Sequence, residues 1–218
     1  MTESDFLPEG TLRGLPGPLP EGERRVWQGA PGTRGVFLRV FHARLVALWF
    51  GAAALAFALA APSRLEALAA AAPVLLAGLL ALALLGLFAW LVHRTTVYTL
   101  TNRRMVLHVG IALPITLNLP FAQIEAAGLH AFRDGSGDLP LRLKDGQRIA
   151  YLHLWPHARP WRVARPEPML RSVPEAARVA RLLAEALAAH HGASESVVPV
   201  IVAQPSEPAL PGRLVPAE

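Results

Sequence analysis

Two long apolar runs without a single charge constrain this chain more than any other feature of its sequence. Residues 45–61 read LVALWFGAAALAFALAA and residues 74–92 read VLLAGLLALALLGLFAWLV. A helix needs about 17–25 apolar residues to cross the hydrocarbon core, and it satisfies its own backbone hydrogen bonds in lipid. Because only residues 62–73 separate the runs, the sequence predicts a transmembrane α-helical hairpin. Two buried helices of a soluble core would need a larger surrounding protein than 218 residues supply.

The residues that flank the two runs agree with a hairpin. Trp49 near the start of the first run and Trp90 near the end of the second fit aromatic anchors at one membrane face. Pro62 ends the first helix, because its ring clashes with the preceding turn. The N-terminal residues are acidic and rich in Pro and Gly, so no signal peptide is predicted.

The distribution of arginine predicts the orientation of the hairpin. Between residues 24 and 44 the chain holds five arginines and no acidic residue, namely Arg24, Arg25, Arg34, Arg39 and Arg44. Arg94, Arg103 and Arg104 follow the second run, again without an acidic residue, whereas the connection holds only Arg64 and Glu66. An excess of Lys and Arg marks the cytoplasmic side. Both termini are therefore predicted to be cytoplasmic.

The overall charge of the chain fits a membrane surface better than nucleic acid. The formal net charge is +5 and the sequence pI is about 10.9, values that by themselves suggest an anionic partner. The arginines gather beside the apolar runs, where anionic headgroups attract them, so no nucleic-acid partner is expected. The mean hydropathy of +0.36 is high for a soluble domain. The absence of cysteine excludes disulfides and thiolate metal sites.

Composition divides the chain into four parts. Residues 1–34 form an extended segment rich in Pro and Gly, and residues 35–94 hold a basic, amphipathic approach followed by the hairpin. Residues 95–191 form a cytoplasmic domain. Residues 192–218 carry many prolines and are predicted to be a disordered tail.

The pattern of the third part predicts an α+β fold, an antiparallel β-barrel or sheet capped by a C-terminal helix. Strands are predicted over residues 95–100, 104–109, 115–119, 124–131, 139–143 and 148–154. Asp145-Gly146 between the last two is a strong hairpin signal. Ser172 and Glu175 suggest a capping box for a helix over residues 174–189, whose apolar face must be covered by the sheet. Prolines and two-residue alternation argue against a third span over residues 105–121.

Several segments together resemble a known family. YTLTNRRMVLHVG (residues 98–110) resembles the opening of the bacterial PH-like membrane domains. LPEGERRVWQG (residues 19–29), ALPITLNLPFAQIEAAGL (112–129), YLHLWPHARPW (151–161) and PEPMLRSVPEAARVARLLAEAL (166–187) are similar to the PuhB family of photosynthetic-complex assembly proteins from purple-type phototrophic bacteria. The resemblance covers roughly residues 27–191.

The resemblance implies a PH-like fold and a non-enzymatic membrane factor that helps to build the photosynthetic reaction centre. Its partners would be reaction-centre membrane polypeptides and membrane lipid, in the bacterial inner membrane, cytoplasmic or intracytoplasmic; a homo-oligomer is compatible with this reading. A PH-like fold alone does not decide function. The alternative is a membrane-surface module that binds anionic lipid, for which Arg94, Arg103 and Arg104 are the candidate residues.

Residues that could carry chemistry are few. The chain has no G-x-S-x-G, H-E-x-x-H or P-loop motif, so no enzyme, metal site or cofactor is expected. His42 and His93 lie at the cytoplasmic mouths of the two runs, where a neutral imidazole could ligate the magnesium of bacteriochlorophyll. An interfacial polar anchor is the favoured interpretation of both, because neither histidine lies inside an apolar run.

The segment 154–161 is the main candidate for a partner-binding site. It holds Trp155, His157, Arg159 and Trp161 together with two prolines that stiffen the backbone. Trp and Arg are enriched in the residues that dominate protein interfaces. Two alternatives stay open: the rings could cover one end of the sheet with Arg159 stacked on them, or they could insert at the membrane surface.

Overall fold

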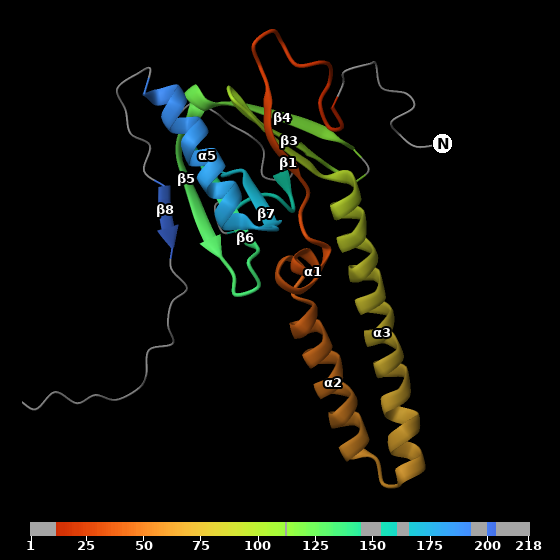
Figure 1. Ribbon diagram of the computed structural model, residues 1–218. Helices are drawn as coiled ribbons and strands as arrows, with labels where there is room; N and C mark the ends of the chain where they lie inside the picture. Colours follow the sequence, from red (N-terminus) through yellow and green to blue (C-terminus); the bar gives the residue numbers. More distant parts are fainter. Residues whose placement is uncertain (1–11, 112, 145–153, 161–165, 193–199, 204–218) are drawn as a thin grey trace, which may run out of the picture.

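The computed structural model describes residues 12–111, 113–144, 154–160, 166–192 and 200–203. Figure 1 shows two regions, a long helical hairpin and a domain built from two sheets and one helix. The hairpin consists of α2 (Ala43–Ala60) and α3 (Arg64–Thr95), which pack side by side in opposite directions. By length and composition, both helices are apolar enough to cross a membrane.

The helix α3 is longer than the apolar run that predicted it. It begins at Arg64 and carries Pro73 within it, so much of the predicted connection is helical. Ser63 explains the early start: its side chain accepts a hydrogen bond from the Glu66 N–H and donates one to the Glu66 carboxylate. The alanines that follow favour helix. The 32 residues span about 48 Å, against about 27 Å for the 18 residues of α2.

A short, bent arm connects the two regions before α2 begins. It consists of α1 (Thr33–Gly35) and η2 (Val36–Val40), a wider π-helical turn. This arm packs on the last turns of α3, where Val36, Ala89 and Val92 form a small buried cluster. His42 then adopts a left-handed conformation, with φ of 52°, and separates the arm from α2.

The first sheet grows directly from the end of α3. Its order is β1 (Arg25–Gly29), β2 (Val97–Thr101), β3 (Arg104–Val109) and β4 (Ile115–Pro120), and all neighbours are antiparallel. β1 corrects the expectation that residues 1–34 form only an extended segment. These five residues pair with the free edge of β2, and Trp27 packs against the core.

The second sheet has the order β7 (Met169–Val173), β6 (Gly137–Leu143), β5 (Ile124–Ala131) and β8 (Val200–Ala203). A short turn, η3 (Phe121–Gln123), links it to β4. The two sheets stay separate, so the domain is not the closed barrel that the sequence allowed. β8 pairs in parallel with β5, which corrects the expectation of disorder at that point of the tail. The predicted strand over residues 148–154 and its Asp145-Gly146 turn lie outside the described residues, except for the buried Leu154.

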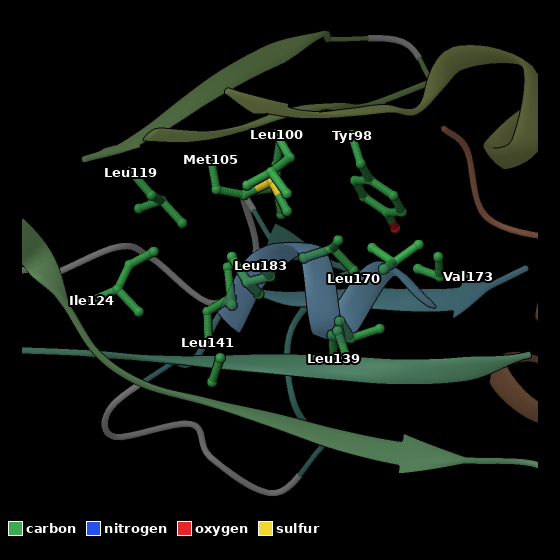
Figure 2. Close-up of a cluster of buried hydrophobic side chains, with 14 of the residues drawn as sticks. Tyr98, Leu100, Met105, Leu119, Ile124, Leu139, Leu141, Leu170, Val173 and Leu183 are labelled. Carbon is green, nitrogen blue, oxygen red and sulfur yellow. The ribbon is translucent and has the colours of Figure 1, made fainter. Parts of the chain in front are cut away.

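The helix α5 (Ala176–His191) completes the domain. Val179, Leu183 and Leu187 face the core as predicted. Figure 2 shows the core side chains of the two sheets and of α5 pointing toward one another. The predicted capping box at Ser172 is wrong: Ser172 belongs to β7, and Glu175 occupies the cap position with φ of 50° and a side chain that caps no backbone N–H of the helix.

Candidate functional site

The Trp155 end of the predicted partner-binding segment lies beside the hairpin. Trp155 leaves 55% of its surface exposed, and its ring centroid is 6.2 Å from that of Phe41. Phe41 follows the bent arm and stands two residues before α2. The geometry therefore places an exposed indole at the level where the first long apolar helix begins, which is where tryptophan sits at a membrane–water interface.

His157 lies inside the domain, where only 1% of its surface is exposed. Its Nδ1 is 2.7 Å from the Tyr98 hydroxyl and its Nε2 is 3.2 Å from the Thr96 hydroxyl. The backbone N–H of Arg171 donates to the Tyr98 oxygen, so the Tyr98 hydroxyl links β7 to the His157 ring. This corrects the expectation that His157 offers its ring to a partner.

The burial of this histidine fixes its charge. Desolvation, with a smaller contribution from the positive charge of Arg171, lowers the pKa of His157 to about 3. Burial likewise raises the pKa of Tyr98 above its usual value. The ring of His157 is therefore neutral at neutral pH. Through its hydrogen bond with Thr96, the residue that follows α3, His157 fixes the 154–160 segment to the end of that helix.

Arg159 is part of the fold as well as of the surface. Its guanidinium donates to the Glu167 carboxylate at 2.7 Å, and its backbone N–H donates to the Glu167 carbonyl at 2.9 Å. About 39% of its side chain remains exposed. Arg159 is therefore an ion-paired arginine. Trp161 lies outside the described residues.

A groove of about 840 Å³ runs along the outer face of the second sheet. Its walls come from alternate residues of β6, which point away from the core, from a continuous stretch of β5 over residues 126–130, and from β7 and the segment before it. The charged and imidazole side chains that line it are Arg39, His42, His130, Asp138, Arg142, Arg159, Glu167 and Arg171. The sequence alone did not predict this groove.

Arg39 joins the hairpin arm to the second sheet. Its guanidinium lies 3.8 Å from the centroid of the Phe132 ring and donates to Ser136 at 2.8 Å and to the Asp134 carboxylate. Hydrogen bonds from Ser136 and Arg39 lower the pKa of Asp134 to about 2. Gly35 of the arm adds a second joint, because a Cβ placed there would lie 2.5 Å from the Ser172 hydroxyl. These contacts couple the orientation of the hairpin to that of the sheet.

The two histidines considered as pigment ligands are occupied differently. His42 is exposed, lines the groove, and has its Nδ1 3.1 Å from the Val40 carbonyl. His93 sits in the last turn of α3, with Nδ1 2.8 Å from the Pro31 carbonyl. That carbonyl can only accept, so Nδ1 of His93 carries the proton. The ring of His42 therefore contacts backbone of the arm, and the ring of His93 contacts backbone just before the arm.

The three arginines considered as a membrane-surface set are not neighbours. Arg94 ends α3, and its guanidinium lies 5.3 Å from the centroid of the Trp90 ring. Arg103 and Arg104 lie at the far end of β2, about 16 Å farther along the strand. Arg104 donates to Glu23 at 2.7 Å. The arginine that contacts Arg94 is Arg13, whose guanidinium donates to the Arg94 carbonyl, and not one from the β2–β3 turn.

The groove residues that sequence reasoning missed share one signal. Asp138, Pro140 and Arg142 alternate with the buried Leu139 and Leu141 along β6, and β5 alternates in the same way. Alternation identifies the outer face of a strand, but it does not say which strands become neighbours.

Among the described residues, no group of three or more His, Cys, Asp or Glu side chains could hold a metal ion.

Comparison with known proteins gives a matching family model and a similar protein. The family model described as "Bacterial PH domain" matches residues 41–187. An uncharacterized 23.7 kDa protein from the puhA 5' region of Rhodobacter capsulatus is 36% identical over 196 residues, which cover 84% of this chain and 86% of that protein. No solved structure matches the chain.

Proposed function

The chain belongs to the bacterial PH domain family, and from that premise we propose that it is a non-enzymatic membrane factor for assembly of the photosynthetic reaction centre. The observation that carries the proposal is the relative encoded in the 5' region of puhA, in a photosynthesis gene cluster. The similarity to PuhB-type assembly proteins, stated above on the sequence segments, agrees with that position.

The proposed factor is anchored by α2 and α3. Both helices are apolar enough to cross a membrane, and their large apolar side chains are exposed rather than packed. Arginine lies on the side of the hairpin where the domain sits, which supports cytoplasmic termini. In this arrangement the domain hangs directly below the bilayer of the bacterial inner membrane, close to newly inserted polypeptides.

Reaction-centre membrane polypeptides are the proposed partners. Two surfaces can meet them: the lipid-facing side chains of the hairpin, and the exposed indole of Trp155 beside Phe41. Exposed aromatic side chains on a braced backbone lose little entropy when they bind. Hydrogen bonds around His157 provide that bracing for the 154–160 segment.

Deletion of the gene tests the proposed function directly. Reaction-centre content should fall while bacteriochlorophyll synthesis continues, because the proposal assigns no step of pigment chemistry to the chain. A chain carrying Trp155→Ala should remain in the membrane but capture less reaction-centre polypeptide after mild detergent extraction. An exposed change on α5, Arg181→Gln, serves as the matched control.

Two results would contradict the assembly role. One is an unchanged reaction-centre yield after deletion. The other is extraction of the full chain with lipid alone under conditions that preserve complexes between other membrane proteins. The second result would favour the alternative function, a membrane-surface module that binds anionic lipid.

A further inference from the structure

The groove on the outer face of the second sheet has a floor of small side chains. Gly128 of β5 and Pro140 of β6 line it, and Met169 of β7 lies opposite Pro140 in the register of the sheet. A glycine in a strand often marks a place where another backbone approaches closely. The middle of the groove therefore offers an apolar floor on which an extended chain can lie near the sheet.

The two ends of the groove lie at opposite ends of β6. Asp138 stands at one end and Arg142 at the other, four residues later and about 13 Å farther along the strand. Both side chains lie on the outer face, because residues two and four apart on a strand share a face. The Asp138 end is the one beside the hairpin arm, since Arg39 donates to Ser136 just before β6 begins.

Arg171 gives the arm end of the groove a buried and incompletely compensated positive charge. Its side chain is 9% exposed, and its Nε has no hydrogen-bond partner among the described residues. The nearest carboxylate oxygen, Oδ2 of Asp138, lies 3.7 Å from Nε, beyond hydrogen-bonding distance. The other oxygen of Asp138 accepts from the Ser172 N–H at 2.7 Å. A further carboxylate in the groove would stabilise this guanidinium, because buried charge is costly without close partners.

Arg142 supplies a separate positive charge at the far end. Its side chain is exposed, and within the described residues no carboxylate forms an ion pair with it. The other arginine on that part of the lining, Arg159, is paired with Glu167 at 2.7 Å and adds no net charge. Each end of the groove therefore presents one arginine that lacks a close anionic partner.

The spacing of the two arginines defines what can bind both. An extended polypeptide has the same two-residue period as β6, so a side chain that meets Arg171 is followed four positions later by one that meets Arg142. The side chain midway between them lies over Pro140. We propose that the groove binds an extended acidic segment of a partner polypeptide, with two carboxylates four positions apart and an apolar side chain midway between them.

The position of the groove favours a segment that leaves the membrane. His42 lines the arm end, and α2 begins at the next residue, Ala43. A polypeptide that emerges beside α2 meets the groove at His42 and can run along it toward Arg142. A single lipid headgroup or a free phosphate reaches only one of two arginines at ends about 13 Å apart. This inference rests on the proposed function, binding of membrane polypeptides, and names the kind of segment that is bound.

Peptide binding to the purified full chain tests the proposal. The chain is held in a maltoside detergent, which carries no charge, and titrated into the fluorescein-labelled peptide Glu-Ser-Leu-Ser-Glu, capped at both ends. The control peptide, Glu-Leu-Ser-Glu-Ser, has the same composition but places its carboxylates three positions apart, on opposite faces of an extended chain. Fluorescence anisotropy should show about tenfold tighter binding of the first peptide, because only that peptide can pair with both arginines.

Substitution of Arg142 connects the binding to the groove. Arg142→Glu should weaken binding of Glu-Ser-Leu-Ser-Glu about tenfold, because it puts a like charge opposite the second carboxylate. A peptide with lysine in place of one glutamate, tested in both orders, should recover the lost affinity in this variant. Arg181→Glu, on the exposed face of α5, changes the net charge of the chain equally and should leave the binding unchanged.

Three results would overturn the proposal. Equal binding of the two peptides to the parent chain would show that the groove does not read the spacing of the carboxylates. Unchanged binding in Arg142→Glu would place the peptide elsewhere. Displacement of the peptide by phosphatidylglycerol at a lower concentration than by unlabelled peptide would assign the groove to a lipid. If any of these occurs while deletion of the gene still lowers reaction-centre content, the groove assignment fails and the proposed function stands.

Discussion

In the α2–α3 hairpin Leu80 exposes 70% of its surface, whereas in the two-sheet domain Leu183 exposes 1%. The residue type is the same and the helices are both regular, yet one leucine points outward and the other into a core. The hairpin hides little apolar surface because its helices have only each other and the short arm to pack on. The domain hides its apolar face between two sheets and α5. The comparison supports the proposed placement of the hairpin in lipid and of the domain in water.

Replacing a leucine by aspartate in each region should give the largest difference between the two regions. Leu183→Asp buries a carboxylate in the core and should destabilise the domain by about 3 kcal/mol or more. Leu80→Asp should leave the domain intact and instead oppose insertion of α3, by about 2.5–3.5 kcal/mol near the bilayer centre. Limited proteolysis of the domain and carbonate extraction of membranes separate the two effects. Loss of protease resistance with Leu80→Asp would contradict the division.

The joint between the regions is the next place to test. Gly35→Leu inserts a side chain where even a Cβ would lie 2.5 Å from the Ser172 hydroxyl, so the arm must move away from β7. We expect a loss of about 1–3 kcal/mol in domain stability, as for other overpacked sites. Thermal unfolding of the purified chain measures it. Gly17→Leu, at a glycine with open space around it, is the control.

Acid should weaken the domain through His157. Its pKa is about 3 in the folded state against 6.5 for the ordinary side chain, so the unfolded chain binds the proton first as the pH falls. The contribution of the buried neutral ring is complete above about pH 6.5 and is lost progressively down to about pH 3, at roughly 1 kcal/mol per pH unit. His157→Gln should flatten this part of the stability profile. Equal slopes for both chains would show that other groups cause the acid sensitivity.

Ser63 and Ser172 each begin an S-x-x-E pattern, but replacing them by alanine should change stability by different amounts. Ser63→Ala removes a cap that the Glu66 N–H uses and should weaken the start of α3 by about 1 kcal/mol. Ser172→Ala removes a buried hydroxyl without a hydrogen-bond partner among the described residues, so its cost should be near zero. Thermal unfolding of both variants against the parent chain measures the difference. A larger loss from Ser172→Ala would show that its hydroxyl is satisfied in solution.

Sequence reasoning located the elements that depend on local pattern. The strands that became β3 and β5 were predicted at their observed bounds, because two-residue alternation is local. The apolar face of α5 was predicted for the same reason. The S-x-x-E pattern failed at Ser172, since Asp138 binds its backbone N–H and keeps the residue in β7. The same pattern at Ser63 does form a cap, although it lies outside the apolar runs in a stretch of small residues.

The candidate site was harder to predict, because it depends on which strands meet. Trp155 and Arg159 were chosen by residue type, but the type of His157 did not reveal that Tyr98 and Thr96 would enclose it. Arg142 and Arg171 line one groove only because β6 pairs with β7. Arg39 reaches it from a different part of the chain. A local sequence pattern does not reveal which distant segments become neighbours in the fold.

Labelling of single cysteines tests the central claim, that the hairpin lies in lipid and the domain in the cytoplasm. The chain has no cysteine of its own, so each introduced thiol reports one position. Cysteine should be placed at Pro62 between the helices, at Leu80 in the hairpin and at Arg181 on α5, and treated with a charged maleimide in cells with a permeable outer membrane. We predict labelling of Pro62→Cys in intact cells, of Arg181→Cys only after lysis, and none of Leu80→Cys. Labelling of Leu80→Cys as fast as Arg181→Cys after lysis would contradict the account.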